Sequence, residues 1–138
     1  MLIITKSVFE KLLKEVEMVP EESCGFLFGK VSNGSTTISK IMPVTNVTPY
    51  NKEVRFLIDG KDFLKAEEIA DTNKLELTGV YHTHLIDSAY PSETDRLSAF
   101  PNFSYLIISL NKLKFSGMKF WKLNTTYQFD EVVFKIIN

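Results

Sequence analysis

The only two histidines of the chain, His82 and His84, lie two positions apart. Residues at positions i and i+2 of a strand point to the same face, so a strand here places both imidazoles in one space and Thr83 on the opposite face. Asp95 follows after a loop and can fold back over the strand end. Two imidazoles and one carboxylate are the protein ligands of a catalytic zinc ion that keeps its fourth position for water.

Each part of this set also has a plainer explanation. Two histidines on a strand are also typical of a hydrogen-bonded core or of a surface facing water. The run Ser92-Glu93-Thr94-Asp95 has the pattern of a helix capping box with Ser92 as the N-cap. The capping box is compatible with a metal site, because a helix N-terminus holds an aspartate rigidly. Two histidines and one carboxylate also describe non-haem iron enzymes.

A hydrolytic zinc site needs a base that takes a proton from water, and a carboxylate is the usual choice. Among the 17 acidic residues, Glu22 is the best candidate because it begins an apolar, strand-like run. The alternative is a solvated acid in a loop between a helix and a strand. Cys24, the single cysteine, raises the possibility of a thiol protease, but beside Gly25 in a strand it is more typical of a small buried hydrophobe.

The composition is that of an ordinary globular protein. With 138 residues we expect one domain, residues 1–138, with a real core. The formal net charge of -1 argues against broad attraction to nucleic acid or to an anionic membrane. Met1–Thr5 is too short for the hydrophobic region of a signal peptide, and no apolar run approaches the length of a membrane span. We therefore expect a cytoplasmic protein, and a single cysteine agrees with a reducing compartment.

The elements that must position these residues follow from periodicity and turn signals. The predicted helices are Ser7–Met18 with a capping box at Ser7-Glu10, a second from the Asp59 cap to Asn73, and a short third from Ser92 to about Phe100. The predicted strands are 21–29 and 36–42 around an Asn33-Gly34 turn, then 54–58, 75–84 with Gly79 inside it, 104–110, 119–123 and 127–137. This order predicts an α/β (mixed α+β) fold with a single mixed β-sheet flanked by helices.

Three segments together resemble a known family. They are Pro20-Glu21-Glu22-Ser23-Cys24-Gly25-Phe26-Leu27-Phe28-Gly29, Gly79-Val80-Tyr81-His82-Thr83-His84 and Pro91-Ser92-Glu93-Thr94-Asp95. They resemble the JAMM (MPN-domain) metalloproteases, especially the small stand-alone bacterial members. The family pattern is a glutamate just ahead of a Cys-Gly strand, then His-x-His, seven residues, and Ser-x-x-Asp, and this chain matches it at the same spacing.

The resemblance implies a role for each matched residue and a JAMM/cytidine-deaminase-like architecture. It implies that His82, His84 and Asp95 bind one Zn²⁺ per chain, that Glu22 is the general acid and base, and that Ser92 helps to hold the oxyanion. The implied partner is a ubiquitin-like or sulfur-carrier protein whose flexible C-terminal tail is cut after Gly-Gly. Neither nucleic acid nor a membrane is implied. A non-catalytic MPN-type scaffold and a non-haem iron enzyme are the alternatives.

One position departs from the family, which commonly has proline directly after the second histidine where this chain has Leu85. Proline there would fix the backbone as the strand leaves the site. For substrate contact, an extended tail could add to an exposed sheet edge. Phe56 and the loop 43–50 are further candidates for that contact.

Overall fold

The computed structural model describes residues 1–138, and the strands outnumber the helices. In chain order the elements are β1 (Leu2–Thr5), α1 (Lys6–Val16), β2 (Cys24–Ser32), β3 (Ser35–Val44), α2 (Gly60–Thr72), β4 (Glu76–His84), α3 (Glu93–Leu97), β5 (Ser104–Asn111), β6 (Lys114–Leu123), β7 (Phe129–Val132) and β8 (Phe134–Ile137). No helix is long and apolar enough to cross a membrane.

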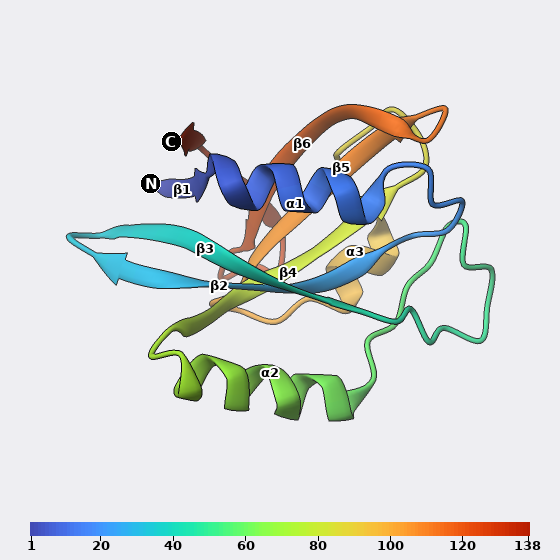
Figure 1. Ribbon diagram of the computed structural model, residues 1–138. Coiled ribbons are helices and arrows are strands. Elements are labelled where there is room, and N and C mark those ends of the chain that lie inside the picture. The colour runs from blue at the N-terminus through green and yellow to red at the C-terminus, as the bar shows by residue number, and fades with distance from the viewer.

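All strands belong to one mixed sheet in the order β7-β6-β5-β4-β2-β3-β1-β8. The strand of the histidines, β4, lies inside this sheet, antiparallel to β2 and parallel to β5. Helix α1 covers one face and α2 covers the other (Figure 1). The predicted fold class, a single mixed sheet flanked by helices, is confirmed. A substrate strand cannot add beside β4, because both of its sides are already paired.

The two edge strands, β7 and β8, are separated along the chain by Val133 alone. Consecutive Cα atoms are about 3.8 Å apart, so the end of β7 and the start of β8 must be close in space. The sheet therefore curves until its two edges approach each other. The rings of Phe120 on β6 and Phe134 on β8 pack with centroids 5.1 Å apart, which agrees with this curvature.

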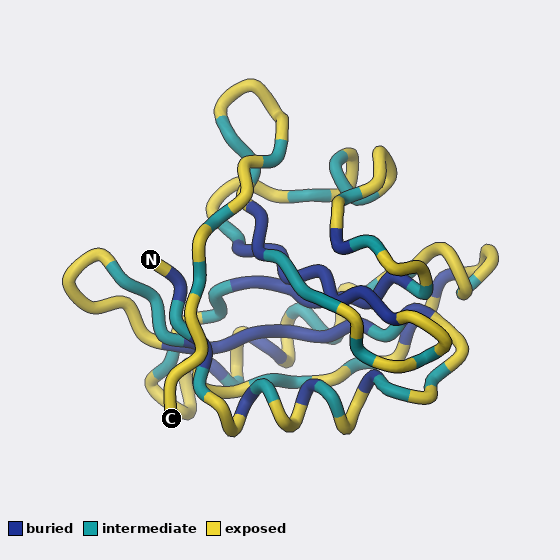
Figure 2. The backbone as a smooth tube through the Cα atoms, turned by 90° about the horizontal axis from the view of Figure 1, so that it is seen from above, coloured by how far each residue is buried: buried dark blue, intermediate teal, exposed yellow.

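The buried residues follow the central strands (Figure 2), and their side chains divide between the two faces of the sheet. On the α1 side, Leu12 packs in one apolar cluster with Tyr81, Leu106 and other strand residues. On the α2 side, a second cluster includes Val80. Side chains alternate along a strand, so His82 and His84 point to the same side of the sheet as Val80, the side that α2 covers.

Gly79 permits the close approach of β4 and β5. A Cβ atom at this position would lie 1.9 Å from the carbonyl oxygen of Ser104 on β5, a distance that no side chain tolerates. The prediction that a glycine here lets another element approach closely is confirmed.

The first helix begins and ends earlier than predicted. Its N-cap is Thr5, whose Oγ1 accepts a hydrogen bond from the Val8 N–H at 3.2 Å, so the predicted capping box starting at Ser7 is wrong. Thr5 can act as the cap because β1, which was not predicted, leads directly into α1. The helix stops at Val16, and Met18 beyond it has a φ of 66°.

The other boundaries differ where long-range contacts decide them. Val54–Ile58 is irregular, so the predicted strand there is wrong. Strand β6 starts at Lys114, and the predicted last strand divides at Val133 into β7 and β8. Strand β2 begins only at Cys24, which leaves Glu22 ahead of it. The Asn33-Gly34 turn and the Asp59 cap are confirmed; both turn residues have positive φ, and Asp59 Oδ1 accepts from the Lys61 N–H.

Candidate metal centre

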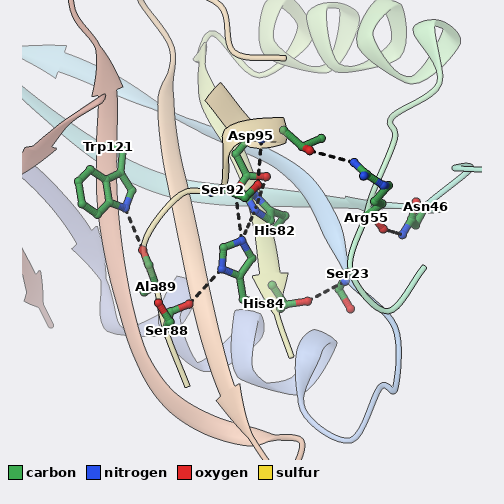
Figure 3. Close-up of polar contacts among 12 residues, drawn as sticks. Ser23, Asn46, Arg55, His82, His84, Ser88, Ala89, Ser92, Asp95 and Trp121 are labelled. Atoms are coloured by element: carbon green, nitrogen blue, oxygen red, sulfur yellow. Dashed lines mark hydrogen bonds and ion pairs between the residues drawn. The ribbon is translucent and has the colours of Figure 1, made fainter. Parts of the chain in front are cut away.

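Three side chains from β4 and α3 converge at the end of the sheet (Figure 3). His82 Nε2 lies 3.1 Å from His84 Nε2 and 3.3 Å from Asp95 Oδ1, and His84 Nε2 lies 3.1 Å from Asp95 Oδ2. The three ligand atoms all lie within 4.8 Å of one another. The strand period places both imidazoles on one face, and the chain after β4 brings α3 back over them.

The hydrogen bond on the far side of the His84 ring decides which nitrogen faces the cluster. His84 Nδ1 lies 3.0 Å from the carbonyl oxygen of Ser88, and because a carbonyl oxygen only accepts, Nδ1 carries the proton. In the neutral ring, Nε2 then presents a lone pair to His82 and Asp95. A cation stabilises such a convergence of lone pairs and carboxylate oxygens. The donor set therefore fits a metal ion.

Packing orients the His82 ring. Phe56 stacks on it with the ring centroids 4.4 Å apart and the planes inclined by 21°. Burial lowers the pKa of His82, although hydrogen bonding to Asp95 opposes that effect, so the imidazole is neutral near pH 7. Neutral imidazole is the form that binds a metal. Nδ1 of His82 is buried and has no hydrogen-bond partner.

Asp95 reaches the imidazoles from the first turn of α3. The N-cap Ser92 accepts a hydrogen bond from the Asp95 N–H at 3.0 Å through Oγ, and Asp95 Oδ2 accepts one from the Ser92 N–H at 2.8 Å. The predicted capping box is confirmed, and the same aspartate faces the histidines. The Ser92 hydroxyl accepts a hydrogen bond in the cap, so its own proton is still free to be donated.

The carboxylate of Asp95 and the ring of His84 influence each other's ionisation. Burial raises the pKa of Asp95, but the contacts with the two imidazole rings and the hydrogen bond from the Ser92 N–H outweigh it and hold that pKa well below its usual range. Burial also opposes a charge on His84, yet hydrogen bonding to Asp95 and its negative charge raise the pKa of His84. Asp95 is thus an ionised carboxylate, as a metal ligand must be.

Glu22 lies opposite His84 where the pairing of β2 and β4 continues beyond the regular ladder. Cys24 is the first residue of β2 to pair with β4. Before it, the Thr83 N–H donates to Ser23 O at 3.0 Å, and the Ser23 N–H donates to Thr83 Oγ1 at 2.8 Å. One position further, Glu22 comes beside His84, because residues opposed in antiparallel strands share a face.

The environment of Glu22 makes its carboxyl group a weak acid. The residue is 6% exposed. Burial raises the pKa of Glu22 to about 7, with Asp95 adding to the rise while His84 and Arg55 oppose it. A carboxyl group with such a pKa can exchange a proton with water at neutral pH.

The side chain of Asn46 holds the backbone of Glu22. Asn46 is 7% exposed, and its Nδ2 donates to Glu22 O at 3.0 Å and to Arg55 O at 2.9 Å. Its Oδ1 accepts from the N–H groups of Leu57 at 3.0 Å and Thr48 at 3.1 Å. The two donor and two acceptor positions of the amide are therefore all used. Two of these bonds hold the irregular segment 54–58, at Arg55 O and at the Leu57 N–H.

A cavity of about 280 Å³ opens beside the cluster, and Asp95 forms part of its wall. Its lining is mostly apolar, whereas Arg55 and Thr94 add polar groups near Asp95. The remaining lining residues are Val54, Phe56, Leu57, Ile58, Phe63, Val80, Ser98, Phe100 and Tyr105. Phe56 therefore contacts both His82 and this cavity.

Cys24 does not have the properties of a nucleophile. It is 1% exposed, and burial raises the pKa of its thiol to about 12. A reactive cysteine needs an accessible thiolate at neutral pH. The interpretation of Cys24 as a small buried hydrophobe is confirmed.

The loop that follows β4 is anchored without the family's proline. Leu85 is partly buried against the apolar cluster on the α1 side. Further along, the Trp121 Nε1–H donates to Ala89 O at 3.0 Å, and Ser88 O accepts from His84. These contacts fix the path of the chain from β4 to α3.

Two residues at the site have no clear signal in the sequence. Asn46 is one of several polar residues in the predicted loop 43–50, and only its four hydrogen bonds distinguish it. Arg55 fell within a predicted strand, where its side chain would have seemed an ordinary surface charge. The one available signal was scarcity, since the chain has only two arginines, Arg55 and Arg96.

Comparison with known proteins agrees with this geometry. Residues 5–124 match the family described as prokaryotic homologs of the JAB domain. The chain is 35% identical over 94 residues to a desampylase of Pyrococcus furiosus, an alignment that covers 68% of this chain and 63% of the relative. It is 30% identical over 92 residues to the CysO-cysteine peptidase of Mycobacterium tuberculosis, covering 65% of this chain and 60% of the relative. The chain thus spans less than two thirds of the length of these relatives.

Solved structures share the fold over nearly the whole chain. A protein from Desulfitobacterium hafniense superposes with a TM-score of 0.84 at 27% identity and covers 99% of this chain and 92% of its own. A JAB1/MPN domain protein from Archaeoglobus fulgidus has a TM-score of 0.60 at 17% identity, covering 99% of this chain and 97% of its own, which is a likeness of fold alone. From the matched family over most of the chain, we conclude that the protein belongs to the prokaryotic homologues of the JAB domain.

Proposed function

We propose that the protein is a zinc-dependent metallopeptidase or isopeptidase that cuts after the C-terminal tail of a ubiquitin-like or sulfur-carrier protein. The observation that carries this proposal is the convergence of His82, His84 and Asp95 beside the buried acid Glu22. The relatives named desampylase and CysO-cysteine peptidase support the substrate class.

One Zn²⁺ per chain is the proposed cofactor, held by His82, His84 and Asp95. Two neutral imidazoles and a carboxylate form a common ligand set for catalytic zinc. When bound, zinc lowers the pKa of a water molecule and polarises the carbonyl group of the substrate. Glu22 and Ser92 are the residues that would then handle protons and charge.

Glu22 is proposed to move the proton. Its carboxylate takes a proton from the attacking water, and the resulting acid delivers this proton to the departing amine. A pKa of about 7, caused mainly by burial, suits both directions of transfer at neutral pH. Ser92 is proposed to donate its free hydroxyl proton to the oxygen that gains negative charge in the tetrahedral transition state.

We further propose that residues 1–138 act as one domain in the cytoplasm. The pairing of β1 with β8 supports a single domain, because it joins the first strand to the last. The proposed partner is the carrier protein itself, with neither nucleic acid nor a membrane involved. Its tail would approach the metal centre across the segment 45–58, since β4 has no free edge.

The test is cleavage of a sulfur-carrier or ubiquitin-like protein that bears a C-terminal extension after its Gly-Gly. We expect cleavage by the wild-type protein and none after chelation of the metal. Glu22→Ala should lower the rate about a hundredfold or more, the usual contribution of a general acid–base group. Glu21→Ala is the matched control, because Glu21 is the acid next to Glu22 in the chain and is exposed. Equal rates for Glu22→Ala and wild type would remove Glu22 from the mechanism, and metal-loaded protein without cleavage would favour a binding role.

A further inference from the structure

The cavity beside the metal centre contains a positively charged group without an acidic partner. Arg55 lines the cavity. Its Nη1 donates to Thr94 Oγ1 at 2.9 Å, the hydrogen bond drawn as the dashed line from the labelled Arg55 in Figure 3. No carboxylate lies within ion-pair distance of Arg55, whereas Arg96, the other arginine, pairs with Glu93. The other N–H groups of the Arg55 guanidinium have no acceptor in the protein, so they are available to a ligand.

The position of Arg55 is fixed at both ends. Its carbonyl oxygen accepts from the same Asn46 Nδ2 that donates to Glu22 O, so the backbones of Arg55 and Glu22 are bridged by one amide group. Its guanidinium is held by Thr94, the residue directly before Asp95. Arg55 therefore spans the space between the general base and a metal ligand.

The chemistry of the leaving group determines what such a cation can recognise. In the proposed reaction the carbonyl–nitrogen bond of the tail breaks, water supplies hydroxide to the carbonyl carbon, and Glu22 returns the proton to the departing amine. The amine must therefore lie near Glu22. In a free α-amino acid a carboxylate is attached to the carbon next to that amine. In a lysine joined through its side chain, the backbone is a long alkyl chain away and carries no such charge.

We propose that Arg55 binds the α-carboxylate of the leaving group, and that the protein therefore releases a single C-terminal amino acid from a carrier tail in preference to a lysine-linked protein. This inference rests on the proposed function. A guanidinium group presents parallel N–H donors that match the two oxygens of a carboxylate, a geometry that lysine cannot reproduce.

The test uses three synthetic peptides with the same Gly-Gly end. One is joined to alanine, one to alaninamide, and one to the side-chain amine of a lysine whose backbone is capped. We expect the wild-type protein to have a kcat/KM for the alanine peptide about 10- to 100-fold above that for the alaninamide peptide, the range of hydrogen bonds to charged groups. Arg55→Met should remove this preference, so that the ratio of kcat/KM for the alanine peptide to that for the alaninamide peptide falls to about one.

Two variants serve as controls for Arg55→Met. Lys65→Met removes an exposed positive charge on α2 and should keep the full preference. Arg55→Lys keeps the positive charge and should retain only part of the preference for the alanine peptide. The inference is overturned if Arg55→Met slows the alanine and alaninamide peptides equally, or if the wild-type protein cleaves the lysine-linked peptide best.

A binding measurement separates this inference from the proposed function. In the Glu22→Ala background, titration calorimetry should give a lower Kd for the alanine peptide than for the alaninamide peptide, and adding Arg55→Met should abolish that difference. If the wild-type protein cleaves none of the peptides but shows this Arg55-dependent binding, the hydrolase proposal fails and the role of Arg55 stands. If it cleaves all three without preference and binding shows no difference, the role of Arg55 fails and the hydrolase proposal stands.

Discussion

The two halves of the candidate site are held in place by different means. His82 and His84 belong to β4, which is paired along its length with β2 and β5. Glu22 precedes β2, and its carbonyl oxygen is held by the side chain of Asn46. The proposed ligand pair therefore depends on the sheet as a whole, whereas the proposed general base depends on a few bonds to a loop.

Because of this difference, a substitution can disturb the proposed proton transfer without disturbing the proposed metal binding. A strand in the middle of a sheet opens only when much of the protein unfolds, whereas a loop can open locally at a small cost. One side-chain hydrogen bond contributes about 0.5–1.5 kcal/mol. Substitutions in the loop 45–58 should thus affect Glu22 while the ligands keep their arrangement.

The largest effect is expected from removing a ligand. His84→Ala should reduce the metal content from about one ion per chain to almost none, because two remaining groups do not make a zinc site. The fold should persist, since the backbone pairing of β4 is untouched. Metal analysis together with circular dichroism measures both quantities. Thr83→Ala, on the opposite face of β4, should keep the metal; a His84→Ala protein that retains its ion would refute the ligand assignment.

The second prediction concerns the stability of the metal-free protein. Glu22 has a pKa of about 7, raised from 4.5. A pKa raised by folding means that the protonated form is favoured in the folded state, so the stabilisation is full below pH 4.5 and is lost as the pH rises through 7. Relative to Glu22→Gln, the free energy of unfolding should fall by roughly 3 kcal/mol across this range. Urea unfolding in the presence of a chelator measures it, with Glu21→Gln as the control substitution at the neighbouring exposed position. Parallel curves for wild type and Glu22→Gln would contradict the burial of this charge.

The third prediction addresses the loop that holds the base. Asn46→Asp keeps both acceptor positions and removes the two N–H donors to Glu22 O and Arg55 O. We expect a loss of about 1–3 kcal/mol in the free energy of unfolding, since buried carbonyl groups lose their partners. The kcat should fall while the metal content stays constant.

Two comparisons show whether Asn46 acts through Glu22. In the Glu22→Ala background, Asn46→Asp should cause no further loss of kcat, because the group that it positions is already absent. Asn51→Asp is the matched control in the same loop, where only the retained acceptor is used. Additive losses in the double variant would mean that Asn46 acts on the fold in general.

The smallest effect is expected at the anchor of the loop between β4 and α3. Trp121→Phe keeps an aromatic ring and removes the N–H that donates to Ala89 O. The neighbouring Ser88 carbonyl orients His84, so metal affinity should fall, though by less than the roughly 10-fold loss expected for a direct partner of a ligand. A competition titration with a metal chelator measures it. Unchanged affinity would show that the Ser88 contact alone fixes the ring.

Sequence signals predicted the features that are local. The spacing of His82 and His84, the Asp59 cap and the Asn33-Gly34 turn each depend on neighbours along the chain, and the structure agrees with all three. Val54–Ile58 has the composition of a strand but folds otherwise, because the side chain of Asn46 supplies bonds from outside the segment. Strand β1 was missed because the segment is too short to show an alternating pattern. Its pairing with β3 and β8 makes it a strand.

At the candidate site, too, the features encoded by neighbouring residues were predictable and those that depend on distant residues were not. The convergence of Asp95 with the histidines was accessible because the spacing and the capping box are encoded within one stretch. The hydrogen bond that holds the backbone of Glu22 could not be predicted, since it comes from the side chain of Asn46, far along the chain. Arg55 became distinctive only through what surrounds it, namely a cavity and a missing acidic partner.

The junction at Val133 has a consequence for the durability of the whole sheet. The strands on either side of it protect opposite flanks, β7 beside β6 and β8 beside β1. Losing the residues after Leu123 would uncover both flanks in a single event. Two rows of backbone donors and acceptors would then be open to other chains, which is how sheet proteins begin to aggregate. This one segment of chain thus covers both flanks of the sheet.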